Sequence, residues 1–348
     1  MANSHKYRGF IGTYTKGNSE GIYTFIFDAE NGKIEEIKLA AKLGNPTYVC
    51  ISKDNRYLYS IVSKGNFGGV AAFSLNSISG ELQLINQETI EGPNPCHVQL
   101  DSKNHYLLAA NYHNGTITAY TIDEENGQVN GNPSVRQHNG NTVEQKPHTH
   151  YASFTPDEKF VVVVDLGIDQ LLTYELIDKT LQKVNHLELK PGSGPRHLVF
   201  HPNGKFAYIM TEYSSEVIVL QYHAANGTFS VLQSISTIPA DFKENNQGSA
   251  IHISSDGRFI YAGNRGHNSI AVFAVEESTG GLTFIERVSS EGNWPRDFAL
   301  DPSEKYIIGS NQESENLVIY KRNPESGKLR LLQSNIQIPH PICIKFLH

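Results

Sequence analysis

The chain has 348 residues and a net charge of −7, with 29 lysines and arginines against 36 aspartates and glutamates. It has no basic run, which argues against a nucleic-acid partner, and it has neither an apolar signal core at its N-terminus nor an apolar stretch long enough to span a bilayer, which argues against a membrane location. The three cysteines are odd in number and do not suggest a disulfide framework, so we expect a cytoplasmic protein with reduced thiols.

A sequence pattern of roughly fifty residues is repeated along the chain. The copies align on an apolar residue at the end of one short strand, and successive copies lie 46 to 54 residues apart. The aligned residues are Ile51, Leu100, Phe154, Phe200, Ile253, Leu300 and Phe346. A period of this length is typical of propellers and solenoids.

The fifth copy shows the pattern clearly. Its β-branched and aromatic runs predict four strands, separated by turns rich in Gly, Asn and Pro. These strands cover residues 195–200, 205–211, 216–222 and 228–235. In other copies a Gly-x-apolar tail is expected to open the fourth strand, at Gly80, Gly127 and Gly327. Four short antiparallel strands in each of seven copies predict an all-β fold, the seven-bladed β-propeller.

The two termini divide one copy of the pattern between them. The chain begins at a second strand, residues 7–11, and ends on a lone first strand, residues 341–346. We expect this last strand to complete the N-terminal blade, because that pairing removes two open sheet edges. No linker or change in composition divides the chain, so we expect one domain that spans residues 1–348.

Two positions of the repeat are expected to converge at one mouth of the propeller. In an antiparallel hairpin, the start of the first strand and the end of the second strand lie at the same end of the sheet. The residues near the start of the first strand are Thr47, Cys96, His150, Arg196, Ser249, Arg296 and Ile342. Those after the second strand are Thr13, Ser63, Tyr112, Leu166, Glu212, Arg265 and Gln312. Because the two columns are polar and differ from blade to blade, they predict a ligand site.

Several arginines with histidines and carboxylates suit a small anionic ligand. Structural roles are the alternative for some of these residues. Arg296 could simply pair with Asp297, Asp165 could cap a loop, and Asn311 could form a turn. The His-x-His pair at residues 148–150 could bind a metal, but no Cys or carboxylate follows it at ligand spacing, so we expect no metal.

Four short motifs in successive blades resemble those of a known family. They are Pro147-His148-Thr149-His150, Gly194-Pro195-Arg196-His197, Asn264-Arg265-Gly266-His267 and Pro295-Arg296-Asp297-Phe298. Together with Glu212, they make the chain resemble the β-propeller 6-phosphogluconolactonase family, to which fungal muconate-lactonising cycloisomerases are related. The resemblance covers essentially the whole chain and is weakest in blade two, at residues 63–69.

The resemblance implies hydrolysis of 6-phospho-D-glucono-1,5-lactone, a step of the oxidative pentose phosphate pathway, without a metal or an organic cofactor. Water must attack the lactone carbonyl, so Glu212 or His150 would be the general base and Arg196 would stabilise the carbonyl oxygen. Arginines would bind the substrate phosphate through forked hydrogen bonds. The expected substrate-binding residues are His148, Asp165, His197, Arg265, His267, Arg296 and Asn311.

Two other functions stay open at this point. One is that of a hydrolase or cycloisomerase for a different lactone, which the same mouth would serve. The other is that of a non-catalytic interaction scaffold. A scaffold predicts apolar or aromatic residues on the exposed loops, whereas the predicted mouth of this chain carries arginine, histidine and glutamate.

Overall fold

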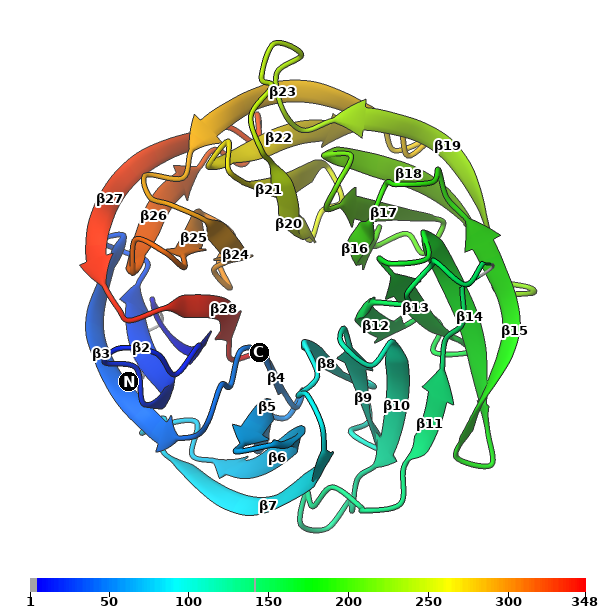
Figure 1. The fold of residues 1–348 in the computed structure, drawn as a ribbon. Helices are drawn as coiled ribbons and strands as arrows, with labels where there is room; N and C mark the ends of the chain where they lie inside the picture. The colour runs from blue at the N-terminus through cyan, green and yellow to red at the C-terminus, as the bar shows by residue number, and fades with distance from the viewer. Residues whose placement is uncertain (1–4, 141) are drawn as a thin grey trace.

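Seven small β-sheets stand in a ring around one axis (Figure 1). The structure is a computed structural model that describes residues 5–140 and 142–348. Within these residues the regular elements are 28 strands, and each sheet has four of them in antiparallel order. No helix that could cross a membrane occurs in the described part of the chain. The predicted seven-bladed β-propeller is therefore confirmed.

The blades are numbered along the chain, and their strands are given from the innermost to the outermost. Blade one consists of β28 (Pro341–Phe346), β1 (Lys6–Thr13), β2 (Gly21–Asp28) and β3 (Lys33–Lys42). Blade two consists of β4 (Val49–Ile51), β5 (Tyr57–Lys64), β6 (Phe67–Leu75) and β7 (Leu82–Glu91). Blade three consists of β8 (His97–Leu100), β9 (Tyr106–Asn111), β10 (Thr116–Thr121) and β11 (Ser134–Gln137). Blade four consists of β12 (Thr149–Phe154), β13 (Val161–Asp165), β14 (Gln170–Ile177) and β15 (Thr180–Glu188).

The remaining three blades follow the same plan. Blade five consists of β16 (Pro195–Phe200), β17 (Phe206–Thr211), β18 (Glu216–His223) and β19 (Thr228–Ser236). Blade six consists of β20 (Gln247–Ile253), β21 (Phe259–Arg265), β22 (Ser269–Val275) and β23 (Leu282–Ser289). Blade seven consists of β24 (Pro295–Leu300), β25 (Tyr306–Asn311), β26 (Asn316–Arg322) and β27 (Leu329–Gln337).

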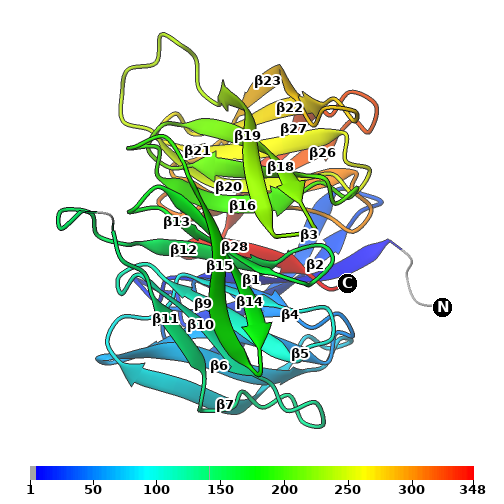
Figure 2. The same cartoon turned by 90° about the vertical axis from the view of Figure 1, so that its right-hand side faces the viewer.

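The C-terminal strand closes the ring, as predicted. Strand β28 pairs with β1 in a ladder that runs from Gly9 opposite Phe346 to Thr13 opposite Pro341. The end of the chain is also attached to blade two, because Asn55 exchanges two hydrogen bonds of 3.0 Å with the backbone of His348. Seen from the side, the C-terminus lies on one face of the disc and the long loop between β19 and β20 projects from the other (Figure 2).

The fourth strand of blade three differs from the prediction. The tail at Gly127 does not open this strand, since Val129 makes only an isolated bridge with Ile122 and β11 begins five residues later, at Ser134. Pro133 stands between these two points and has no N–H group to donate to a ladder, which explains the interruption. In blades two and seven the Gly-x-apolar tail opens the strand as expected, at Leu82 and Leu329.

Neighbouring blades are joined by buried apolar clusters and by a repeated tyrosine contact. The hydroxyl groups of Tyr59, Tyr208 and Tyr261, all on second strands, each donate a hydrogen bond of 3.0 Å to a glycine carbonyl in the next blade. The acceptor of Tyr208 is Gly280, which has φ of +71°, and a Cβ atom there would lie 2.5 Å from the ring of Phe206. Only glycine fits this contact without displacing the blade.

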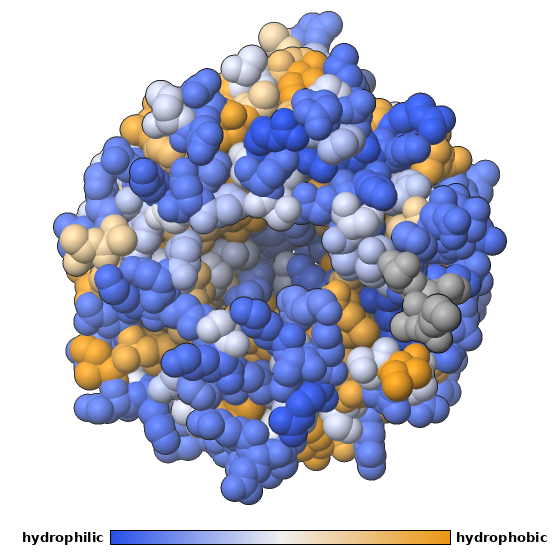
Figure 3. Space-filling model, turned by 180° about the vertical axis from the view of Figure 1, so that it is seen from behind, coloured by the Kyte–Doolittle hydropathy of each residue, from blue (hydrophilic) through white to orange (hydrophobic). Residues whose placement is uncertain are grey.

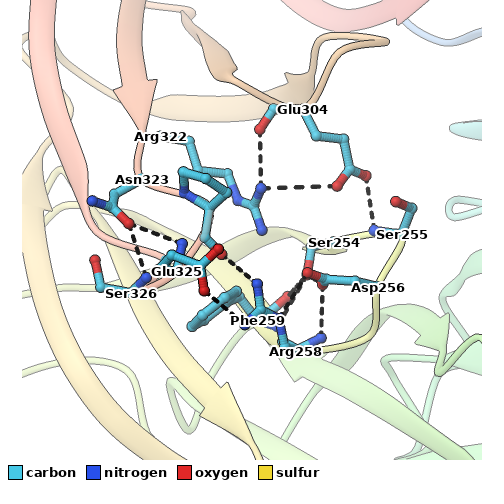
Figure 4. A network of polar contacts seen from close by, with 12 residues as sticks. Ser254, Ser255, Asp256, Arg258, Phe259, Glu304, Arg322, Asn323, Glu325 and Ser326 are labelled. Carbon is cyan, nitrogen blue, oxygen red and sulfur yellow. Dashed lines mark hydrogen bonds and ion pairs between the residues drawn. The ribbon is translucent and has the colours of Figure 1, made fainter.

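Charged side chains reinforce the junctions between blades, shown for blades six and seven in Figure 4. The guanidinium group of Arg258 contacts the carboxylates of Asp256 and Glu325, while the carboxylate of Glu304 accepts a 2.8 Å hydrogen bond from the backbone of Ser255. The turn residue Glu158 makes the equivalent contact with Ser102 between blades three and four. The blades therefore hold the inner strands in a fixed ring, on which the site is built.

Candidate active site

A cavity of about 370 Å³ opens where β16 and β24 begin and where β17 and β21 end. Residues from all seven blades contribute to its wall, and half of them belong to the two predicted columns. The predicted site residues among them are His150, Arg196, His197, Glu212, Arg265 and Arg296. The structure thus brings six of the ten predicted site residues to one mouth, although they span about 150 residues of sequence.

The carboxylate of Glu212 lies between two buried arginines. Its Oε2 atom accepts hydrogen bonds from Arg196 Nε at 3.0 Å and from Arg265 Nη2 at 2.7 Å. The same arginines also donate to backbone carbonyls of β20, Arg196 to Ser249 and Arg265 to Gly248, both at 2.7 Å. Blades five and six therefore supply a rigid cluster with two positive charges and one negative charge.

Arg296 differs from the other two arginines. Its side chain lines the cavity but makes no hydrogen bond or ion pair with any described residue. Its neighbour Asp297 instead accepts a 3.0 Å hydrogen bond from His252, so the alternative in which Asp297 neutralises Arg296 does not apply. Arg296 thus lines the cavity with a guanidinium that has no hydrogen-bonded acidic partner.

Three histidine rings form a buried group beside the cavity, and two of them, His150 and His197, line it. The ring of His197 lies 5.2 Å from that of His150 and 5.6 Å from that of His97, measured between centroids. All three are at most 6 % exposed, and each has one buried ring nitrogen without a hydrogen-bond partner. No group of metal-ligating side chains suitable for an ion occurs among residues 5–140 and 142–348. Buried polar atoms in this state normally meet water or a ligand.

The charges set the protonation states of the site. Burial and the three nearby arginines together hold the pKa of His150 well below its ordinary value of 6.5, so the ring is neutral at pH 7. Burial alone would raise the pKa of Glu212, but the charges of Arg265, Arg196 and Arg296 outweigh it and lower this pKa. Burial lowers the pKa of Arg196 to about 10 and that of Arg265 to about 9, and both therefore stay charged.

Two predicted residues of blade four lie behind the cavity wall. Asp165 is fully buried and bonds to His138 Nδ1 at 2.6 Å, to the backbone of His148 and to Thr149. The ring of His148 stacks on Tyr112 at 4.2 Å, and its Nδ1 donates to the Tyr112 carbonyl at 2.8 Å. Both residues therefore shape the start of β12, the strand that carries His150, and neither lines the cavity.

Two further predicted residues also lie outside the cavity lining. His267 packs against Phe242 and hydrogen-bonds to Ser269 at 2.7 Å through its Nδ1 atom. Asn311 donates to the carbonyl of Ser290 at 2.8 Å, which is the turn-forming role considered as its alternative. Their contacts are with the loops of blades six and seven rather than with the cavity.

Several lining residues were absent from the prediction. They are Tyr14, Tyr48, Asn94, His113, Gln247 and Trp294. Asn94, Gln247 and Trp294 occupy one repeat position, two residues before the first column, and Tyr48 stands one residue after it. The repeat alignment therefore contained this signal, in the positions that flank the polar column.

A second, larger cavity of about 510 Å³ opens on the opposite face, where the space-filling view shows a central hollow (Figure 3). It lies at the ends of the first strands and contains none of the predicted site residues. The two cavities meet at one contact, since Lys345 lines the second cavity and its Nζ donates at 3.2 Å to the hydroxyl of Tyr48, which lines the first. Arg196, Arg265 and Arg296 all line the first cavity.

Comparison with known proteins identifies close relatives over the full length. The family described as "Lactonase, 7-bladed beta-propeller" matches residues 8–346. The chain is 52% identical to the 6-phosphogluconolactonase of Bacillus subtilis over 346 residues, which are 99% of each chain. A solved structure of a periplasmic gluconolactonase from Pseudomonas aeruginosa has a TM-score of 0.93 and 32% identity over 99% of both chains. A putative 6-phosphogluconolactonase from Bacteroides fragilis has a TM-score of 0.91 and 30% identity, covering 100% of this chain and 99% of its own.

Proposed function

Because this chain belongs to the family of seven-bladed β-propeller lactonases, we propose that it hydrolyses 6-phospho-D-glucono-1,5-lactone to 6-phosphogluconate. The reaction is a step of the oxidative pentose phosphate pathway, and we place it in the cytoplasm. The substrate is small, carries a phosphate, and needs an activated water rather than a covalent enzyme intermediate.

The observation that carries the proposal is the unequal pairing of three arginines around one carboxylate. Glu212 compensates one charge of the pair Arg196 and Arg265, while Arg296 has no partner. The cavity is lined by three arginines and two carboxylates, Glu212 and Asp297, and is therefore net positive in a protein whose overall charge is −7. A phosphorylated lactone supplies the missing negative charge, and the fork of Arg296 is suited to its phosphate.

The chemistry follows from the placement of the neutral histidine. The Nδ1 atom of His150 is fully buried, so Nε2 is the ring nitrogen that can meet a water molecule in the cavity. We assign His150 as the base, since its ring is neutral at pH 7, whereas Glu212 Oε2 is occupied by hydrogen bonds from Arg196 and Arg265. As the water oxygen bonds to C1, its proton passes to His150, and Arg196 stabilises the negative charge on the carbonyl oxygen.

The second half of the reaction returns that proton. The C1–O5 bond breaks, O5 takes the proton from His150 and becomes the C5 hydroxyl, and C1 is left as a carboxylic acid that ionises in water. Neutral His150 is restored at the end of the cycle. The residue thus acts as base and then as acid, as microscopic reversibility requires.

A lactone without the phosphate is the second candidate substrate. The relative from Pseudomonas aeruginosa is a gluconolactonase, and its TM-score of 0.93 shows that one architecture serves such an enzyme. The unpaired Arg296 favours the phosphorylated substrate for this chain.

The test uses the purified chain and two histidine variants, with lactone opening followed by acid release in a pH-stat. His150→Gln is expected to lower kcat by roughly 10²- to 10⁴-fold with little change in KM. His186→Gln, the same substitution on the exposed strand β15, is expected to keep the wild-type kcat. If Glu212→Gln loses kcat and His150→Gln keeps it, the base assignment is wrong; if neither loses kcat, the proposed mechanism is wrong.

A further inference from the structure

Trp294 is the single tryptophan of the chain, and it lines the cavity. It precedes β24 and its indole lies beside the guanidinium group of Arg265, with 5.5 Å between Cζ and the ring centroid. Its backbone is fixed on both sides, because its N–H donates to Asn268 at 3.0 Å and its carbonyl accepts from Gln312 at 3.0 Å. The ring is therefore presented to the cavity from a rigid turn.

The backbone of Trp294 has a conformation that large side chains rarely adopt. Its φ is +66°, in the left-handed region that favours glycine. The same turn, one residue before a proline at or shortly before the start of a first strand, has positive φ at Asn45, Gly194 and His340. None of those three residues lines the cavity, whereas Trp294 does.

The blades place different residues in this turn with positive φ. Blade five places glycine in this turn, which removes the backbone strain, and blade two places asparagine, which tolerates it. Blade seven places the largest side chain at the same strained position, where it faces the cavity and the arginine cluster. Strain that persists beside a functional cavity points to a role for the side chain there.

We propose that Trp294 is a substrate-positioning residue, whose indole packs against the C–H face of the lactone ring and keeps Arg265 in place. This inference rests on the proposed function, because it takes a six-membered lactone as the ligand. The indole offers a flat apolar face to a ring that is otherwise surrounded by charged groups. Its contact with Arg265 is a cation–π interaction, which orients the guanidinium without neutralising it.

Because Trp294 is the only tryptophan, its fluorescence reports on this site alone. The wild-type chain is titrated with 6-phosphogluconate, the product of the proposed reaction, with inorganic phosphate and with gluconate. We expect a saturable change in emission with 6-phosphogluconate, at concentrations that match its inhibition of lactone opening. Unchanged emission at inhibiting concentrations would overturn the proposal.

Kinetic variants separate positioning from a merely structural role. Trp294→Gly relieves the backbone strain and is expected to raise KM about tenfold with kcat within threefold, while Trp294→Phe keeps KM within about threefold of wild type. His340→Gly relieves the same strain in a turn outside the cavity and is expected to leave KM unchanged. Equal KM values for Trp294→Gly and His340→Gly would overturn the proposal.

Failure of the proposed function and failure of the role of Trp294 give different results. A wild-type chain that opens no lactone refutes the proposed function. A chain that opens the lactone normally, but whose emission and whose Trp294→Gly KM do not change, refutes only the role of Trp294.

Discussion

Replacing Glu212 by Gln tests the charge cluster most sharply, because the side chain keeps its size and loses only its charge. Glu212 accepts hydrogen bonds of 3.0 and 2.7 Å from two arginines that are each 2 % exposed. Each such charge-assisted bond contributes about 1.5–3 kcal/mol, and Gln retains part of both, so we expect a loss of roughly 3 kcal/mol in the free energy of unfolding.

This loss converts into a measurable melting shift. The entropy of unfolding for a chain of this length is about 0.7 kcal/mol/K, so Tm should fall by about 4 °C. The assay is thermal unfolding by circular dichroism at pH 7. Glu325→Gln removes the same charge from an exposed pair with Arg258 at 3.5 Å, and its Tm should change by less than about 1 °C.

The variant has a second expected effect, of opposite sign. The cavity loses the carboxylate that is hydrogen-bonded to Arg196 and Arg265, so inorganic phosphate should inhibit Glu212→Gln at lower concentrations than it inhibits the wild type. A Tm within 1 °C of wild type, together with unchanged phosphate inhibition, would refute the claim that this carboxylate balances the two arginines.

Three further predictions follow from the same structure. Arg296→Gln should raise KM for the phosphorylated lactone by roughly 10- to 150-fold, equal to one charged contact of about 1.5–3 kcal/mol, and leave KM for the unphosphorylated lactone unchanged; equal effects on both substrates would contradict the anchor role. Deleting residues 341–348 removes the buried Ile342, Cys343 and Ile344 and the ladder to β1, which should cost at least roughly 5 kcal/mol, and a truncated chain that melts like the full one would contradict the closure. The pKa values of His97, His150 and His197 lie well below 6.5 in the folded chain, so the unfolded chain binds more protons below that pH. The Tm of the wild type should therefore fall as the pH drops from 6.5 to 5. The Tm of His97→Gln should fall less steeply over the same range.

Much of the fold could be predicted from the sequence because each blade repeats the same pattern of strand-forming runs and turn residues. The strands of blade five begin and end within one or two residues of the prediction, since turns such as Asn203-Gly204 fix their ends. Strand β11 could not be placed in this way. Its start depends on Pro133 and on packing against blade four, and these override the local signal at Gly127.

The sequence could predict which repeat positions form the candidate site, but not which side chains contact one another there. His150, Arg196 and Glu212 could be placed at one mouth because they share repeat positions. Sequence could not separate Arg296, which has no partner, from Arg265, which has three, because pairing depends on side-chain distances. For the same reason it could not show that Asp165 is enclosed by its own blade.

The most direct test of the central claim compares two substrates of the wild-type chain. The rates of opening of 6-phospho-D-glucono-1,5-lactone and of D-glucono-1,5-lactone are measured against their spontaneous rates under the same conditions. The account predicts that kcat/KM for the phosphorylated lactone exceeds that for the other by at least about tenfold, because one charged contact with Arg296 is worth at least roughly 1.4 kcal/mol. Equal values for the two lactones, or no acceleration of either, would contradict it.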